Sequence, residues 1–280
     1  MYIVIIITFL PLPGSVTCLT FCGNTHMLSA SEDKTICVWN CKTWECLKIL
    51  KGHKGTVNSV SVHPSGRLAM SVSKDKHLRT WNLVTGRSAY VTHIKEDATL
   101  IKWSPSGDCY AVVIGNKIVL YKLAVSMNTA SLSCTLELPR PVLAIEFLTE
   151  TLIVAGGEFD GIRVFDIEKE ACIQTVPGHE SRIKAIEVVH DPFPNEDNCV
   201  LVFSVSSDGD LRAWSFNPEN FEEEAHLVAR YEMNGRPTCL TVSCPTKPTP
   251  KTRKDTKEIA HEEASQENNN ERRPGRESGN

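Results

Sequence analysis

His53, Ser71 and Asp75 are the residues of this sequence whose types could carry out nucleophilic catalysis. A histidine that accepts a proton from a serine hydroxyl and is oriented by an aspartate activates a nucleophile, and the three can follow any order along the chain. The same residue types recur downstream at His179, Ser204 and Asp208. An enzyme needs one such site, whereas a repeat architecture carries the same structural device in several units. The repetition therefore favours a structural network over a catalytic triad.

Aromatic residues mark a repeat along the chain. They end five similar segments and stand at Trp39, Trp81, Tyr121, Phe165 and Trp214, at intervals of 42, 40, 44 and 49 residues. A repeat of about 40 to 45 residues, with Gly-His early and Trp-Asp late, is the signature of a four-stranded propeller blade. The longest interval contains "HDPFPNEDN" (residues 190–198), whose Pro and Asn residues predict a long loop between two strands.

Each repeat has the residue pattern of short antiparallel strands. After Gly52 and His53, the second repeat has an apolar first strand from Val57 to Val62, then strands expected at 68–73, 77–81 and 88–91. The "HPSG", "KDK" and "VTGR" segments between them are turns. No long stretch has a helical period. The sequence therefore predicts an all-β fold, a β-propeller built from four-stranded meanders.

The recurring polar residues could attach the loops of a blade to its strands. Asp75 is expected to accept a hydrogen bond from His53, His53 to contact Ser71, and the Ser71 hydroxyl to accept the indole N–H of Trp81. The matching set in the fifth repeat is His179, Ser204, Asp208 and Trp214. The first, third and fourth repeats have no matching His, and Phe159 takes the position of Asp75 in the fourth. Complete networks are expected in the second and fifth repeats.

These motifs resemble those of the WD-repeat family between residue 14 and about residue 243. The resemblance is strongest from Trp39 to Val91, where "WECLK", "GHKG", "HPSG" and "LRTWNLVTGRSA" are similar to PAK-interacting WD-repeat proteins, as is "IKWSPSG" at residues 101–107. The resemblance implies a seven-bladed propeller without a cofactor. It also implies binding to the regulatory region of a p21-activated kinase, with inhibition of that kinase. A third implication is a place in the nucleus and nucleolus, among pre-ribosomal factors that assemble the large ribosomal subunit.

The chain divides into three expected parts. Residues 1–13 form an atypical amino-terminal segment, residues 14–243 hold the blades, and residues 244–280 form a disordered polar tail with eight Lys and Arg against seven Asp and Glu. Five markers and a possible opening strand in "RPTCLTV" (residues 236–242) are fewer than seven blades require. We therefore expect one to two blades of the family to be missing before residue 14, which would leave an open, marginally stable arc that aggregates.

The amino-terminal segment "MYIVIIITFLPLPG" has three possible interpretations. Its apolar run, residues 2–10, is too short to span a bilayer, so no membrane insertion is expected. We favour a variant start, from alternative splicing or an incomplete gene model. The alternatives are a signal peptide, although no basic residues precede the apolar run, and an edge strand prone to aggregation.

Eleven cysteines raise the question of disulfides or a metal. Their number is odd and their spacing irregular, and many of them, such as Cys18, Cys109 and Cys239, are expected within strands. The segment "CVWNCKTWEC" (residues 37–46) is the nearest to a zinc-ligand cluster, but it lacks a paired CxxC. We expect free thiols in a reducing compartment and no metal.

Composition favours a noncatalytic interaction scaffold. P-loop, HExxH and GxSxG motifs are absent from the sequence, and the net charge of −4 with a pI of about 6.2 gives no electrostatic footprint for nucleic acid. The alternatives are a generic WD-repeat adaptor, such as the substrate receptor of a ubiquitin ligase, and a secreted protein with residues 1–13 as its signal peptide. Candidate partner contacts are the residues just before the turn aspartates, Glu32, Lys74 and Ser207.

Overall fold

The computed structural model describes residues 14–124, 129–190, 199–217, 220–221 and 223–242. These residues form twenty strands in five antiparallel sheets of four strands each, so the prediction of an all-β fold is confirmed. Predictions for three segments lie outside the described residues: the amino-terminal segment 1–13, most of the loop at 190–198, and the tail from 244 to 280.

The strands follow the chain order within each sheet. Sheet 1 contains β1 (Val16–Cys22), β2 (His26–Ser31), β3 (Thr35–Asn40) and β4 (Cys46–Lys51). Sheet 2 contains β5 (Val57–Val62), β6 (Leu68–Ser73), β7 (His77–Asn82) and β8 (Arg87–His93). Sheet 3 contains β9 (Leu100–Trp103), β10 (Cys109–Ile114), β11 (Lys117–Ala124) and β12 (Thr129–Glu137). Sheet 4 contains β13 (Val142–Phe147), β14 (Leu152–Gly157), β15 (Ile162–Asp166) and β16 (Ala171–Val176). Sheet 5 contains β17 (Ile183–His190), β18 (Val200–Ser206), β19 (Asp210–Phe216) and β20 (His226–Glu232).

The turns between strands contain the residues that the sequence marked as turn formers. Gly66, in the "HPSG" turn, has φ +68°, a left-handed conformation that glycine adopts without steric cost. In the β7–β8 connection, the Asn82 side-chain oxygen accepts the backbone N–H of Thr85 at 3.0 Å, a side-chain-to-backbone hydrogen bond within the turn that leads into β8. The meander predicted for the second repeat is therefore present, with each strand within two residues of its expected bounds.

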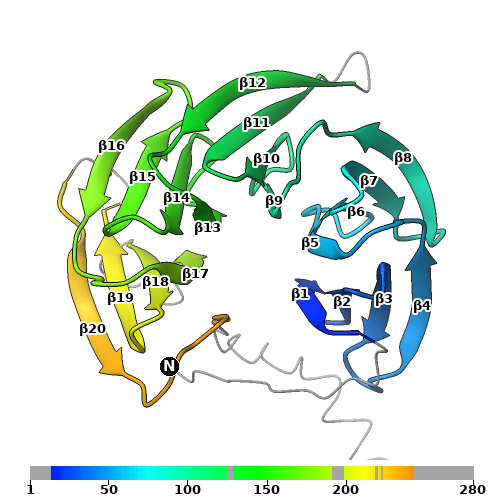
Figure 1. Ribbon diagram of the computed structural model, residues 1–280, viewed down its shortest axis with the longest axis horizontal. Coiled ribbons are helices and arrows are strands. Elements are labelled where there is room, and N and C mark those ends of the chain that lie inside the picture. Colours follow the sequence, from blue (N-terminus) through cyan, green and yellow to red (C-terminus); the bar gives the residue numbers. More distant parts are fainter. Residues whose placement is uncertain (1–13, 125–128, 191–198, 218–219, 222, 243–280) are drawn as a thin grey trace, which may run out of the picture. The chain divides into compact units, whose positions relative to one another are not determined.

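The sheets are arranged as the blades of a propeller. Within residues 14–242, the first strand of each sheet lies innermost and the fourth lies outermost (Figure 1). First strands of successive sheets are in contact: β1 with β5, β5 with β9, β9 with β13, and β13 with β17. Apolar residues fill the space between each pair of neighbouring sheets, as with Leu28 and Trp81 between sheets 1 and 2. The core is thus made of the faces that successive sheets turn toward each other.

One expected strand is not formed. Residues 236–242, "RPTCLTV", have no strand conformation, so the prediction of an opening strand there is wrong. Cys239 was expected within a strand and instead lies in this segment, where it is exposed. An isolated strand leaves its backbone N–H and C=O groups unpaired, and no strand of the described residues pairs with this segment.

Candidate functional site

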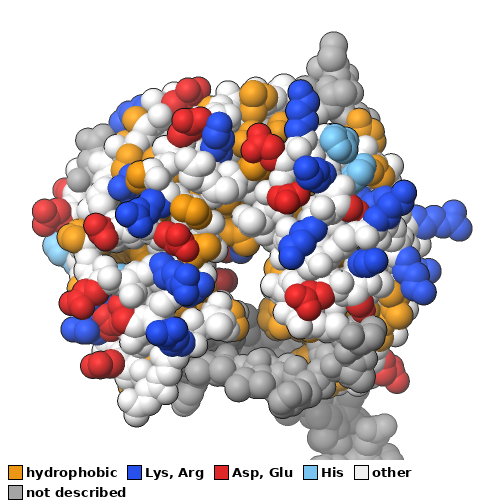
Figure 2. Space-filling model, in the orientation of Figure 1, with side chains coloured by type: hydrophobic (Ala, Val, Ile, Leu, Met, Phe, Trp, Pro, Cys, Tyr) orange, Lys and Arg blue, Asp and Glu red, His pale blue; other side chains and the backbone are white. Residues whose placement is uncertain are grey.

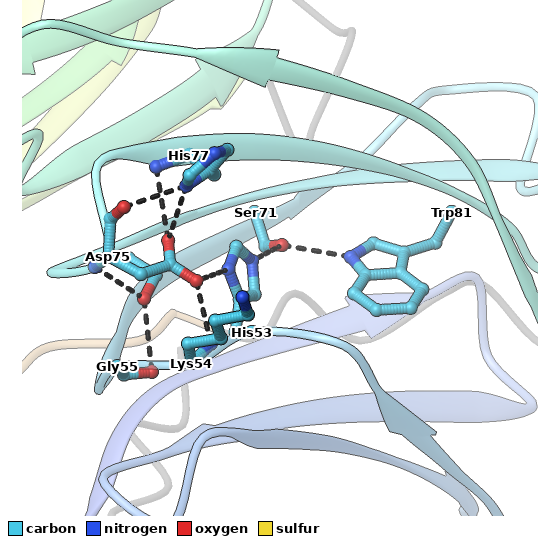
Figure 3. A network of polar contacts seen from close by, with 8 residues as sticks. His53, Lys54, Gly55, Ser71, Asp75, His77 and Trp81 are labelled. Atoms are coloured by element: carbon cyan, nitrogen blue, oxygen red, sulfur yellow. Dashed lines mark hydrogen bonds and ion pairs between the residues drawn. The ribbon is translucent and has the colours of Figure 1, made fainter.

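The structure brings His53, Ser71, Asp75 and Trp81 together in sheet 2 (Figure 3). His53 Nδ1 lies 2.9 Å from Asp75 Oδ2, and His53 Nε2 lies 2.8 Å from Ser71 Oγ. Trp81 Nε1 donates to Ser71 Oγ at 2.8 Å. The four side chains come from the loop before β5, from β6, from the β6–β7 turn and from β7. The network therefore joins one loop and one turn to the two central strands.

The direction of each hydrogen bond follows from what the groups can donate. A carboxylate only accepts, so His53 donates from Nδ1 to Asp75, and its Nε2 accepts the Ser71 hydroxyl proton. The Ser71 oxygen is then free to accept from the indole of Trp81. Burial lowers the pKa of His53, and the hydrogen bond to Asp75 offsets only part of that effect. His53 is therefore a neutral imidazole in the folded protein at pH 7.

Asp75 also organises the backbone around the β6–β7 turn. Its Oδ2 accepts the backbone N–H of Lys54 at 2.7 Å, and its Oδ1 accepts the backbone N–H of His77 at 3.0 Å. Burial by itself raises the pKa of this carboxyl, but the hydrogen bonds from Lys54, His53 and His77 outweigh it and hold the pKa below its usual range. Asp75 is thus an ionised acceptor that fixes the loop before β5 and the start of β7.

Sheet 5 contains two of the three expected contacts. His179 Nε2 lies 2.8 Å from Ser204 Oγ, and Trp214 Nε1 donates to the same oxygen at 3.0 Å. Asp208 was expected to contact His179 and does not: within the described residues, His179 Nδ1 is buried without a hydrogen-bond partner. Asp208 Oδ1 accepts the backbone N–H of Asp210, as Asp75 Oδ1 accepts that of His77, so the turn contact forms in both sheets and only the contact with the histidine is missing from sheet 5.

In the sheets without a central tryptophan, the serine that would accept its indole N–H is also replaced, which was not anticipated from the sequence. Strand register places a serine beside each central tryptophan: Trp39 with Ser29, Trp81 with Ser71, and Trp214 with Ser204. Where the aromatic residue has no indole N–H, the residue at the serine position is apolar: Val112 for Tyr121, and Ala155 for Phe165. A buried N–H without an acceptor costs free energy, so serine is found with tryptophan and an apolar residue is found with Tyr or Phe. In sheet 4, the Asp75 position is held by buried Phe159, with the Arg163 guanidinium 5.1 Å from its ring centroid.

This arrangement cannot act as a nucleophilic triad. Ser71 is 0% exposed, so no substrate can reach its hydroxyl, and its oxygen already accepts the indole N–H of Trp81. Among the residues that the structure describes, no group of three or more His, Cys, Asp and Glu side chains is placed to hold a metal ion. The cysteines found in the described ranges are free thiols. The described part of the chain contains no helix long and apolar enough to cross a membrane. The networks are structural.

Comparison with known proteins assigns this geometry to a family of repeats. The family model "WD domain, G-beta repeat" matches residues 7–40, 44–82 and 170–215, the segments that contain the three tryptophan–serine pairs. The chain contains WD40 repeats. The β-propeller domain of Cps50 (Swd1) from Myceliophteria thermophila has a similar propeller fold: the TM-score is 0.64 at 14% identity, covering 78% of this chain and 72% of that domain.

Two relatives of this WD40-repeat chain are also similar in sequence. A protein of Danio rerio named "p21-activated protein kinase-interacting protein 1-like" is 42% identical over 232 residues, which cover 83% of this chain and 60% of the relative. The Saccharomyces cerevisiae protein named "Protein MAK11" is 28% identical over 245 residues, which cover 77% of this chain and 56% of the relative. The chain thus spans about three fifths of the length of the relatives that it matches.

The three candidate contact residues occupy the same position in their WD40 repeats. Glu32, Lys74 and Ser207 each lie in the turn between the second and third strands. Each backbone N–H donates to a carbonyl that precedes the first strand of its sheet, on Ser15, Thr56 and Arg182 respectively. Glu32 and Lys74 are exposed, whereas Ser207 is half-buried and its hydroxyl accepts from Arg182 Nε at 3.2 Å. Glu32 and Lys74 are the side chains that a partner could reach.

A charged group on the innermost strands was missed by the sequence analysis. Lys102 on β9, Glu146 on β13 and Glu187 on β17 occupy equivalent positions of the WD40 sheets 3, 4 and 5, and the Lys102 ammonium is in direct contact with the Glu146 carboxylate. Burial and the nearby Glu146 carboxylate raise the pKa of Glu187 to about 7, although Lys102 partly opposes this. The residues are 44 and 41 positions apart, so only the repeat register could have brought them together.

Proposed function

We propose that this chain is a noncatalytic scaffold for protein–protein interaction that binds the regulatory region of a p21-activated kinase and lowers its activity. The observation that carries the proposal is 42% identity over 83% of the chain to the Danio rerio protein, whose name describes interaction with such a kinase. The β-propeller offers turn residues for contact and buries its polar networks, which agrees with binding rather than catalysis.

We further propose that the chain acts in the nucleus and nucleolus, together with pre-ribosomal assembly factors of the large subunit. The resemblance of "WECLK" and "LRTWNLVTGRSA" to the PAK-interacting WD-repeat family supports this role. The similarity to MAK11 is a second, weaker support. Protein contacts would carry the association, because the net charge of −4 does not favour binding to RNA.

Affinity purification followed by mass spectrometry tests both parts of the proposal. The tagged chain, expressed in cells, should retain a p21-activated kinase together with large-subunit assembly factors, and imaging should place it in the nucleolus. Enrichment of ubiquitin-ligase subunits in their place would favour the adaptor alternative. Recovery from the culture medium would favour the secreted alternative.

An in vitro assay tests the kinase interaction directly. The purified chain should bind the isolated regulatory region of the kinase and lower phosphorylation of a peptide substrate by the full-length enzyme. Lys74→Glu changes an exposed turn residue, and Lys122→Glu makes the same charge change on the exposed side of β11. If the turn face contacts the kinase, the first variant weakens inhibition and the second does not. Unchanged kinase activity with the wild-type chain would contradict the proposal.

A further inference from the structure

A pocket lies between sheets 1 and 2, at the ends of strands opposite the Asp75 network. Its floor is formed by Leu28 of β2, Val38 of β3 and Leu50 of β4, and two of these, Leu28 and Leu50, are almost fully buried. The volume is about 280 Å³. This is close to the lower limit of small-molecule sites, about 300 Å³, and suits one large side chain better than a whole ligand.

Two turns of sheet 2 form one wall of the pocket. Gly66 ends the "HPSG" turn, and Leu83, Val84, Thr85 and Gly86 form the β7–β8 turn. Gly86 has φ +65°, and a Cβ built there would lie 3.0 Å from Cε of Lys48, so the aliphatic part of that lysine packs against the turn. At the rim, Leu47 and Val84 are 49% and 76% exposed. Apolar side chains thus continue from the floor to the surface.

The surroundings of the pocket are basic. Lys48 belongs to the lining, and Arg67 and Arg87 directly follow the lining residues Gly66 and Gly86. All three side chains are exposed, and none of them takes part in an ion pair within the ranges that the structure describes. Of the residues that the structure describes, no Asp or Glu lines the pocket.

Positive charge predominates in the sequence of both sheets that form the pocket, sheets 1 and 2. From residue 14 to residue 93 the chain has ten Lys and Arg against four Asp and Glu, whereas from residue 142 to residue 232 it has six against nineteen. Figure 2 shows Lys and Arg side chains over β4 and β8, on the right of the view, and more frequent Asp and Glu side chains over sheets 4 and 5, on the left. The net charge of −4 therefore averages over a basic region and an acidic region.

We propose that this pocket binds an acidic linear segment of a partner protein, with one large apolar side chain of that segment inserted between Leu28, Leu50 and Val84. Basic side chains that form no ion pair within the described residues lie beside an apolar cavity whose described lining has no Asp or Glu. This arrangement is complementary to a leucine or phenylalanine side chain that is flanked by Asp and Glu. The inserted side chain would supply the affinity, and the basic rim would raise the association rate and select the charge of the partner.

The lining favours a peptide over a nucleic acid. Single-stranded nucleic acids bind to exposed aromatic rings on which bases stack, along a basic groove. Among the described residues, the lining contains no Phe, Tyr or Trp, and its floor is made of aliphatic side chains. The imidazole of His26 also lines the pocket, with its Nδ1 atom 2.8 Å from Thr25 Oγ1. Aliphatic floors of this size accept an aliphatic or aromatic side chain of a protein.

This inference deepens the proposed scaffold function by giving one of its partners a stated chemistry. It concerns a face different from the turn residues Glu32 and Lys74, which lie at the opposite ends of the strands of sheets 1 and 2. The two proposals can therefore fail separately. A chain that retains the kinase but does not bind acidic peptides would overturn only the pocket.

The test uses fluorescence anisotropy with the full chain and four defined probes. The first is a fluorescein-labelled nine-residue peptide with a central leucine flanked by aspartate and glutamate. The second has alanine in place of the leucine, and the third has lysine in place of each acid. The fourth is a labelled uridine oligonucleotide. Each probe is titrated at two salt concentrations.

Three variants locate the binding site. Lys48→Glu reverses a charge in the lining, and Val84→Asp places a charge at the apolar rim on a residue that is already 76% exposed. Lys51→Glu is the matched control, since it makes the same charge change at an exposed position of β4 that does not line the pocket. Melting temperatures within about 2 °C of wild type would establish that each variant is folded, and the surface positions make this the expected result.

We expect the acidic leucine peptide to bind and the alanine and lysine peptides to bind at least about tenfold more weakly. Lys48→Glu and Val84→Asp should each lower the affinity for the leucine peptide about tenfold, and Lys51→Glu should change that affinity less than about twofold. If Lys48→Glu and Lys51→Glu weaken binding of the leucine peptide equally, the peptide responds to the overall charge of the surface and the pocket assignment is overturned. Tighter binding of the oligonucleotide than of the peptide, with the same dependence on Lys48, would overturn the peptide in favour of a nucleic acid.

Discussion

Asp75 is the acceptor on which the loop before β5 depends. Replacement by alanine leaves the His53 Nδ1–H and the backbone N–H groups of Lys54 and His77 without their acceptor. We expect Asp75→Ala to lower the free energy of unfolding by about 1 to 3 kcal/mol, measured by urea denaturation. Asp33→Ala is the control: within the described part of the chain, Asp33 accepts only from the N–H and hydroxyl of Thr35, and no histidine contacts it.

The comparison of these two variants tests the network itself. Both changes remove a turn aspartate that accepts the backbone N–H two residues later. A larger loss for Asp75→Ala isolates the contribution of the buried histidine and of the loop that it holds. Equal losses for both variants would mean that the turn alone carries the effect and that the network contributes no measurable stability.

Glu187 gives the protein a pH dependence of known sign. Its pKa in the folded protein, about 7, lies above the value of 4.5 for a free glutamate, because burial and Glu146 disfavour the charged form. The stability from this group is fully present below pH 4.5 and is lost as the pH rises through about 7. We expect Glu187→Gln to be about 1 to 3 kcal/mol more stable than wild type at pH 8, with a smaller difference at pH 5.

The difference in stability between wild type and Glu187→Gln separates the pH effect of Glu187 from that of the buried histidines. Burial lowers the pKa of His53 and that of His179. The stability that these histidines contribute to the fold is therefore lost as the pH falls below about 6.5, whereas the contribution of Glu187 is lost as the pH rises. Both histidines are present in the parent and in Glu187→Gln, so their effect cancels in the difference. Melting curves of the two proteins from pH 5 to pH 8 check this, and parallel curves would contradict the assignment.

Sequence spacing predicted most of the polar network, residue by residue. It placed His53, Ser71 and Trp81 in contact, because serine and tryptophan are ten positions apart in both units and a histidine precedes the first strand of each. It failed for Asp208. Among the described residues, Asp75 and Asp208 both accept the backbone N–H two residues on, but only Asp75 also contacts a histidine. In sheet 5, Asp210 is paired with Arg212 and Arg230, ion pairs that have no counterpart at His77 and that the spacing of the repeat does not contain.

At the scale of the strands, each tryptophan is matched with a serine across the β-hairpin. Ser29→Ala leaves the buried Trp39 N–H without an acceptor, and Trp39→Phe removes the donor together with part of the ring volume. We expect each single variant to lose about 1 to 3 kcal/mol. The double variant should lose about 1 kcal/mol less than the sum, since it recreates the Ala155 and Phe165 pair of sheet 4.

A double-mutant cycle by chemical denaturation measures this coupling. Cys37→Ser combined with Ser29→Ala is the control pair, because Cys37 is the partner of Ser29 in the strand register whereas the hydrogen bond of the indole goes to Ser29. Strict additivity for Ser29 and Trp39 would show that the hydrogen bond between them has no net energetic role.

The strands were the part of the fold that the sequence predicted best. Turn residues and apolar alternation placed all four strands of sheet 2, because both signals are local. The pocket between sheets 1 and 2 could not be predicted, since its lining comes from strands and turns up to 64 positions apart in the chain, from Cys22 to Gly86. Only the packing of one sheet on the next brings these segments together.

At the scale of the whole chain, sheet 1 differs from the other four sheets on its innermost strand. Leu19 and Phe21 of β1 are 48% and 49% exposed. The register-equivalent residues of Leu19 in sheets 2 to 5, Val60, Ile101, Ile145 and Ile186, are at most 5% exposed. In those sheets the side chain belongs to a hydrophobic cluster that it shares with residues of the preceding sheet. Sheet 1 therefore presents apolar side chains that the described part of the chain leaves partly uncovered.

Exposed apolar residues on a strand favour self-association, so we expect the 280-residue chain to form oligomers or aggregates at micromolar concentrations. Leu19→Asp combined with Phe21→Lys should shift the population toward the monomer, because the new charges oppose dehydration of this face without removing buried contacts. Size-exclusion chromatography with light scattering measures the change. Leu132→Asp combined with Tyr90→Lys is the matched control, since these residues are 61% and 66% exposed on the outer strands β12 and β8. A monomeric wild-type chain, or equal effects of the two pairs, would show that the face of β1 does not drive association.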